Sequence, residues 1–105
     1  PSGRVPLRIT ADGPIPAPRE LESPKPAYTP EAMRARIEGT VVMEVLVDEE
    51  GRVPDARVIR SIPLLDQAAL NTVKTWRFMP SRVNGNPVPV LVTVEMSFNL
   101  RESPR

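Results

Sequence analysis

The residue types that carry out chemistry in proteins are sparse in this chain. Its 105 residues include no histidine and no cysteine. The commonest general base, the thiol nucleophile and the usual zinc ligands are therefore missing. The acidic run DEEG at residues 48–51 carries carboxylates of the kind used in metal binding or acid–base catalysis. It lacks the ligand spacing of an EF-hand loop, so we interpret it as the solvated turn of a hairpin.

Two other patterns contain residue types found in reactive or binding sites but lack the arrangement that such sites need. Ser61 and Lys74 are the residue types of a serine–lysine pair, but Ser61 precedes a predicted helix and Lys74 lies on its polar side. The segment NGNP at residues 84–87 has turn residues but no helix start after them, so it is not a phosphate cradle. The sequence therefore predicts no enzyme, no metal site and no cofactor.

Charge and hydropathy exclude several classes of partner. The chain has 14 lysines and arginines against 13 aspartates and glutamates. Nucleic acid binding favours a basic excess on one face, and a membrane surface favours a basic run; neither is present. No apolar run reaches the length of a transmembrane helix, and no signal peptide is visible. Because the chain begins with proline, we expect it to be a piece of a longer protein.

Proline divides the chain near residue 30. Eight of the 14 prolines fall in the first 30 residues. Proline lacks an N–H group and has a fixed φ, so this stretch cannot form a helix or a central strand. We interpret residues 1–23 as a linker, either a flexible tail or a strap lying on the domain. Residues 24–100 are predicted to form one small domain, and residues 101–105 a tail.

Two helices and a hairpin are predicted between residues 29 and 76. Thr29 is suited to cap a short helix that Pro30 begins and Gly39 ends. Residues 39–61 alternate apolar and polar side chains around the acidic turn, which predicts a hairpin with a bulge beside Pro54. Residues 62–76 are predicted to be helical, with an apolar stripe formed by Leu65, Ala69, Val73 and Trp76. We interpret Trp76 and Phe78 as core residues rather than an aromatic platform.

The last element, residues 88–100, is a long strand with a single apolar face. The tight turn Asn84-Gly85 leads into it. A hairpin followed by a helical crossover makes the second and third strands run in the same direction, so the first strand must separate them. The sequence therefore predicts an α+β fold, with a three-stranded antiparallel sheet in the order 2-1-3 and two helices packed on one face. The last strand is then an edge, whose free N–H and C=O groups can pair with another chain.

An ordered set of motifs resembles the C-terminal domain of the TonB energy-transducer family. The stretches are "PAYTPEAMRARIEGTVVMEVLVDEEGRVPDARVIRS" and "LDQAALNTVKTWRFMPSRVNGNPVPVLVTVEMSFNL", which cover about residues 24–100. The matching features are Tyr28, Gly39, Val41, Gly51, Val53, Ser61, Leu65-Asp66, Ala68-Ala69-Leu70, Trp76-Arg77-Phe78, Pro80, Gly85 and the last strand. Two positions depart from the family pattern: Thr29 separates Tyr28 from Pro30, and Lys25 replaces a ligand-contacting glutamine.

The resemblance implies a TonB/TolA C-terminal-like fold and a function for the exposed edge. In this family the last strand accepts the TonB box, a short extended segment of an outer-membrane transporter. The full-length protein is anchored in the inner membrane with ExbB and ExbD partners, which use the proton gradient, and force passes through its periplasmic domain. The resemblance places peptide contacts on two segments. They are Val88, Val90, Leu91, Val92, Thr93, Val94, Glu95 and Met96 in the last strand, and Ser23, Lys25 and Tyr28 before the first helix.

Other uses of the same edge stay open from sequence. Strand addition relies on main-chain hydrogen bonds, so one edge can accept varied peptide sequences. The proline-rich residues 1–20 could instead cover the edge, or a second copy of the domain could pair with it in an edge-to-edge homodimer. The domain could also be a scaffold or sensor part appended to another membrane protein, without energising a transporter.

Overall fold

The computed structural model describes residues 6–9, 13 and 15–100. Short strands and the first helix come first along the chain: β1 (Leu7–Arg8), β2 (Arg19–Glu22) and α1 (Pro30–Arg34). The hairpin and second helix follow as β3 (Gly39–Val47), β4 (Asp55–Arg60) and α2 (Asp66–Val73). The chain ends with β5 (Arg77–Met79), β6 (Arg82–Val83), β7 (Asn86–Pro87) and β8 (Val90–Phe98). None of the helices in these described ranges is long and apolar enough to cross a membrane.

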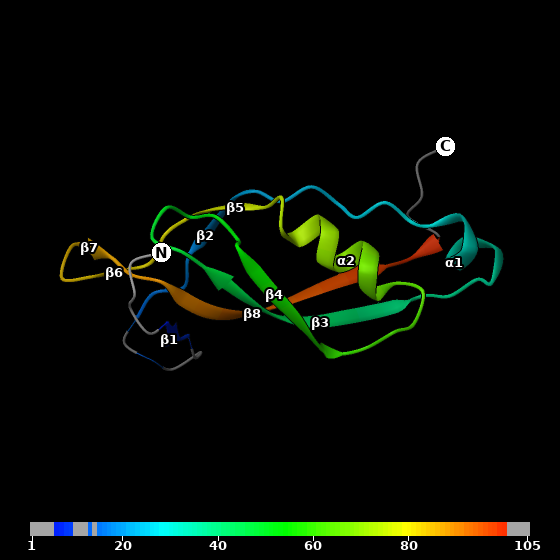
Figure 1. The fold of residues 1–105 in the computed structure, drawn as a ribbon, viewed down its shortest axis with the longest axis horizontal. Coiled ribbons are helices and arrows are strands. Elements are labelled where there is room, and N and C mark those ends of the chain that lie inside the picture. The colour runs from blue at the N-terminus through cyan, green and yellow to red at the C-terminus, as the bar shows by residue number, and fades with distance from the viewer. Residues whose placement is uncertain (1–5, 10–12, 14, 101–105) are drawn as a thin grey trace.

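The main sheet has the order β1-β8-β3-β4 (Figure 1). β3 lies in the middle and pairs antiparallel with β4 on one side and with the whole of β8 on the other. The predicted order 2-1-3 is thus confirmed as β4-β3-β8. The prediction of three antiparallel strands is wrong, because β1 pairs parallel with β8 and makes the sheet mixed. Residues 7–9 follow Pro6 and keep their N–H groups, so even this proline-rich stretch can form a short edge strand.

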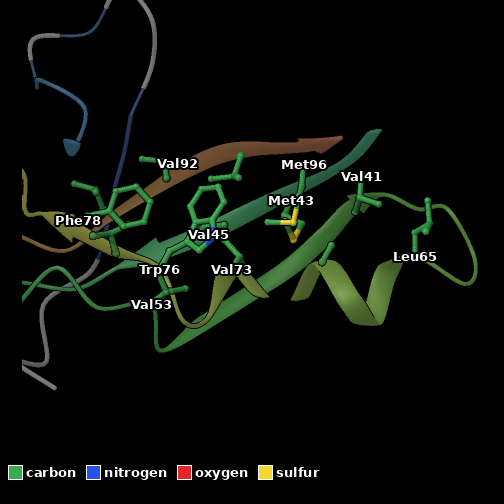
Figure 2. Close-up of a cluster of buried hydrophobic side chains, with 14 of the residues drawn as sticks. Val41, Met43, Val45, Val53, Leu65, Val73, Trp76, Phe78, Val92 and Met96 are labelled. Atoms are coloured by element: carbon green, nitrogen blue, oxygen red, sulfur yellow. The ribbon is translucent and has the colours of Figure 1, made fainter. Parts of the chain in front are cut away.

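The core lies between the sheet and α2, and it is mostly aliphatic (Figure 2). Alternate residues of β3 and β8 point into it, which confirms the predicted apolar faces of both strands. The apolar stripe predicted for residues 62–76 is also buried. It includes Ala69 and Val73 of α2 and the flanking residues Leu65 and Trp76. α2 covers the sheet face, as predicted (Figure 1). The prediction that both helices pack on this face is wrong for α1, which lies past the end of the sheet and contributes only Ala32 to the buried core.

Both helices are shorter than the sequence indicates. Thr29 caps α1 as predicted, because its hydroxyl oxygen accepts a hydrogen bond from the Ala32 N–H at 3.1 Å. The helix stops before Gly39, however, since Arg36 takes a left-handed φ of 54°. α2 begins only at Asp66, whose carboxylate accepts from the Ile62 N–H at 2.8 Å. The preceding residues form a turn that this carboxylate closes, rather than the first turn of the helix.

The hairpin has its acidic turn where it was predicted. The Asp48 carboxylate accepts hydrogen bonds from the backbone N–H groups of Glu50 and Arg52, both at 2.9 Å. The predicted bulge beside Pro54 is wrong, because β4 starts only after this proline and needs no ladder donor from it. The register shift lies further along instead, at Ile59 opposite the Val42–Met43 step.

Residues 16–24 lie along the domain and are called the strap from this point on. β2 pairs antiparallel with β5. The Ser81 hydroxyl donates to the Pro16 carbonyl at 2.8 Å, and the Trp76 indole N–H donates to the Pro24 carbonyl at 3.0 Å. The interpretation of residues 1–23 as a linker, tail or strap stays a prediction. The domain boundary at residue 24 stays a prediction, and the predicted tail 101–105 lies outside the described residues.

Candidate peptide-binding edge

The outer edge of β8 is defined by the direction of its backbone groups. The Leu7 N–H donates to the Pro89 carbonyl and the Ile9 N–H to the Leu91 carbonyl, each at 3.0 Å. Backbone direction alternates along a strand, so the N–H and C=O groups of Thr93, Glu95 and Ser97 point to this same edge. β1 pairs with β8 only at Val90 and Leu91. Among the described residues, no strand pairs with residues 93–97 on this side.

The residues predicted on the last strand fall into two groups. Leu91, Thr93 and Glu95 direct their backbone groups to the outer edge and their side chains away from the core. The other five have side chains at most 9% exposed that point into the core: Val88, Val90, Val92, Val94 and Met96. Val88 precedes β8 and donates its N–H to the Ser81 carbonyl at 2.9 Å. The side chains of these five residues anchor the strand in the core. Leu91, Thr93 and Glu95, which lie between them, direct their backbone N–H and C=O groups to the outer edge.

The residues predicted before α1 occupy different environments. Ser23 and Lys25 are exposed. Tyr28 is half-buried, with its hydroxyl donating to the Ile37 carbonyl and its ring packed edge-on against Phe98, centroid to centroid 5.5 Å. Burial, followed by the negative charge of Glu38, raises the pKa of the Tyr28 phenol. Tyr28 thus fastens this segment to the far end of β8.

A charged row on the exposed face of the sheet was not foreseen from sequence. Glu44 is only 8% exposed although it is an acid in the central strand. Its carboxylate accepts from the Arg57 guanidinium at 2.9 Å and from Arg8 of β1. Arg57, and then Arg8, lower the pKa of Glu44. The acid occupies an outward position of an alternating strand, but nothing in the sequence indicates a partner 36 residues away.

An open hollow adjoins the outer edge of β8. It has a volume of about 480 Å³, within the usual range for ligand sites. Its lining combines the N-terminal segment with the strand: Ile9, Gly13, Ile15, Pro16, Ala17, Val92 and Thr93. The hollow therefore begins where β1 ends, beside the first unpaired part of the edge.

Catalytic chemistry does not assemble in the described part of the chain. The Ser61 hydroxyl donates to the Asp66 carboxylate, and Lys74 is exposed at the end of α2. No group of three or more acidic side chains in the described ranges could hold a metal ion. Trp76 and Phe78 are buried with ring centroids 6.2 Å apart, which confirms the core interpretation. The arrangement offers a backbone edge rather than a reactive centre.

Comparison with known proteins agrees with this architecture. The family model described as Gram-negative bacterial TonB protein C-terminal matches residues 24–100. The Protein TonB of Xanthomonas campestris pv. campestris is 38% identical over 77 residues, covering 71% of this chain and 34% of the relative. The Protein TonB of Vibrio cholerae is 33% identical over 78 residues, covering 72% and 32%. The chain thus spans about a third of the length of these curated relatives.

A solved structure extends the similarity to three dimensions. The solution structure of the Pseudomonas aeruginosa TonB C-terminal domain superposes with a TM-score of 0.63 and 32% sequence identity. The superposition covers 84% of this chain and 90% of that one. The family match, the relatives and the shared fold agree. The chain belongs to the TonB C-terminal domain family, a family of non-enzymatic energy transducers.

Proposed function

We propose that this chain is a periplasmic module that captures the TonB box of outer-membrane transporters by strand addition to the outer edge of β8. The single observation that carries the proposal is the backbone of Thr93, Glu95 and Ser97, directed outward and unpaired with any described strand. The whole protein would be anchored in the inner membrane and work with ExbB- and ExbD-like partners driven by the proton gradient.

The energetics of strand addition suit a reversible contact. Three outward residues offer three N–H donors and three carbonyl acceptors. Each main-chain hydrogen bond contributes about 0.5–1.5 kcal/mol net. A few such bonds give modest affinity, and because they involve the backbone they tolerate different peptide sequences. One transducer can therefore serve several transporters.

The inner side of β8 is suited to carry force. β8 pairs with β3 over nine residue pairs, from Gly39 with Phe98 to Val47 with Val90. A pull along β8 loads these pairs together in shear, so they resist better than bonds opened one at a time. The peptide would be held on one side of β8, and the load would pass to the central strand on the other.

The test removes one donor from the edge without removing the strand. Glu95→Pro deletes the outward N–H and stays compatible with an edge position, whereas Glu95→Ala deletes only the side chain. Binding of a fluorescent synthetic TonB-box peptide is measured by anisotropy, with folding checked by the fluorescence of Trp76. We expect Glu95→Pro to weaken binding about tenfold or more and Glu95→Ala to bind like the unsubstituted chain. Equal binding by the two folded variants would refute the proposal.

A further inference from the structure

The edge proposed to receive a peptide already holds a segment of the same chain. Residues 7–9 lie alongside the first residues of β8, with Leu7 and Ile9 donating to the carbonyls of Pro89 and Leu91. The pairing is parallel, with Leu7 opposite Val90 and Arg8 opposite Leu91. This is strand addition within one molecule.

A side-chain contact fixes the same segment to the sheet. Arg8 is paired with Leu91, and Glu44 with Thr93, so the Arg8–Glu44 ion pair crosses β8 diagonally on the exposed face. Arg57 holds the other carboxylate oxygen of Glu44 at 2.9 Å, which orients the acid toward β1. Ile9, the residue after β1, packs against the hydrophobic core.

The position of this segment limits what can bind next to it. β1 runs in the same direction as β8 and ends beside Leu91. A second strand can pair freely with Thr93, Glu95 and Ser97, but a strand that reaches Leu91 or Pro89 meets Ile9 and Leu7. The hollow lined by Ile9, Val92 and Thr93 lies at this junction.

We propose that residues 7–9 are a built-in competitor, a strand that occupies the start of the receiving edge and that an incoming transporter segment must displace. The inference rests on the proposed function, since it concerns access to the same edge. Displacement breaks the backbone hydrogen bonds that join β1 to β8, among them those donated by Leu7 and Ile9. It also breaks one ion pair, which contributes little because its arginine side chain is 64% exposed. The apparent affinity for the peptide is then reduced in proportion to the fraction of molecules in which the edge is open. We expect this reduction to be about tenfold.

A reversible cross-link tests the competitor directly. Arg8 and Leu91 are opposite each other in neighbouring strands, which lie about 4.8 Å apart, within the Cα range of a disulfide. The chain has no cysteine, so the double substitution Arg8→Cys with Leu91→Cys allows a single disulfide. The oxidised form holds β1 on the edge, and the reduced form of the same protein releases it. Arg8→Cys alone, under both redox conditions, is the matched control.

The readout is the affinity for a labelled synthetic TonB-box peptide. We expect the oxidised double variant to bind at least about tenfold more weakly than the reduced form of the same protein. Leu7→Pro provides a second route, because Leu7 is 39% exposed and the substitution removes only its donor to Pro89. This variant should bind several-fold more tightly than the unsubstituted chain.

The outcomes separate this inference from the proposed function. Weak binding by the oxidised form, together with tighter binding by Leu7→Pro, supports the competitor. Equal binding by the oxidised and reduced forms, or unchanged binding by Leu7→Pro, overturns the competitor and leaves the proposed function standing. Absence of binding in every form, including the reduced one, overturns the proposed function and the inference with it.

Discussion

Gly51 and Gly85 form a matched pair for testing how the hairpin turn is held on the domain. Both have a left-handed backbone, with φ of 80° and 81°. A Cβ atom added at Gly51 would come within 1.8 Å of the Phe78 carbonyl oxygen, whereas one at Gly85 would meet nothing within 4 Å. The Gly51 carbonyl also accepts from the Phe78 N–H at 2.8 Å. The two alanine substitutions therefore share backbone strain and differ in the clash.

The magnitudes follow from these contacts. Alanine in a left-handed conformation costs about 1–2 kcal/mol, partly offset by a less flexible unfolded chain. Gly85→Ala should therefore lower the free energy of unfolding by about 1 kcal/mol. Gly51→Ala must also displace β5 and break its hydrogen bond, which adds about 1–3 kcal/mol for a partner left unsatisfied. We expect a total loss of about 2–4 kcal/mol for Gly51→Ala.

Urea unfolding measures this difference, with the fluorescence of Trp76, the one tryptophan of the chain, as the signal. We expect Gly51→Ala to be less stable than Gly85→Ala by at least about 1 kcal/mol. Equal losses in the two variants would refute the reasoning, because they would mean that the approach to Phe78 has no energetic consequence.

Three further predictions concern the strap, the start of α1 and the charged row. Trp76→Phe removes the indole donor to Pro24 and leaves a gap in the core, so it should cost about 1–3 kcal/mol of stability and speed amide exchange in the strap; unchanged exchange would contradict this. Tyr28→Phe keeps the ring packing but loses the bond to Ile37, so its loss in urea unfolding should also be about 1 kcal/mol, and no loss would argue against that bond. The pKa of Glu44 is lower in the folded than in the unfolded state. The stability that its ionised carboxylate gives the fold is therefore present above the unfolded-state pKa and is lost as pH falls through the folded-state pKa. The melting temperature of the unsubstituted chain should fall between about pH 6 and 3, and Glu44→Gln should show a smaller fall. Identical melting temperature profiles for the two proteins would contradict this assignment.

The parts of the fold that were predictable from sequence are those set by local periodicity. The alternation along β3 and β8, the apolar stripe on α2 and the Asn84-Gly85 turn are each determined by residues close together in the sequence. Asn84 has a φ of 52° and Gly85 of 81°, as a tight hairpin turn requires. The strand order followed from these elements, because a hairpin and a helical crossover make the second and third strands run in the same direction.

The missed features depend on contacts between distant residues. Residues 7–9 are too few to show a strand pattern, and their pairing with Pro89 and Leu91 joins opposite ends of the chain. The late start of α2 depends on one carboxylate, that of Asp66, closing back on Ile62. For the candidate site, the resemblance indicated the last strand, but only the register shows which alternate residues point their backbone outward.

An amide-shift titration of the isotope-labelled chain with a synthetic TonB-box peptide tests the central claim most directly. We predict the largest shifts at Thr93, Glu95 and Ser97, together with shifts at Leu7 and Ile9 as β1 leaves the edge. The exposed residues Ile59 and Arg60 of β4, at the opposite edge of the sheet and away from the Glu44 ion pairs, should not shift. If millimolar peptide leaves residues 93–97 unshifted, or shifts β4 instead, the outer edge of β8 is not the receptor and the account is contradicted.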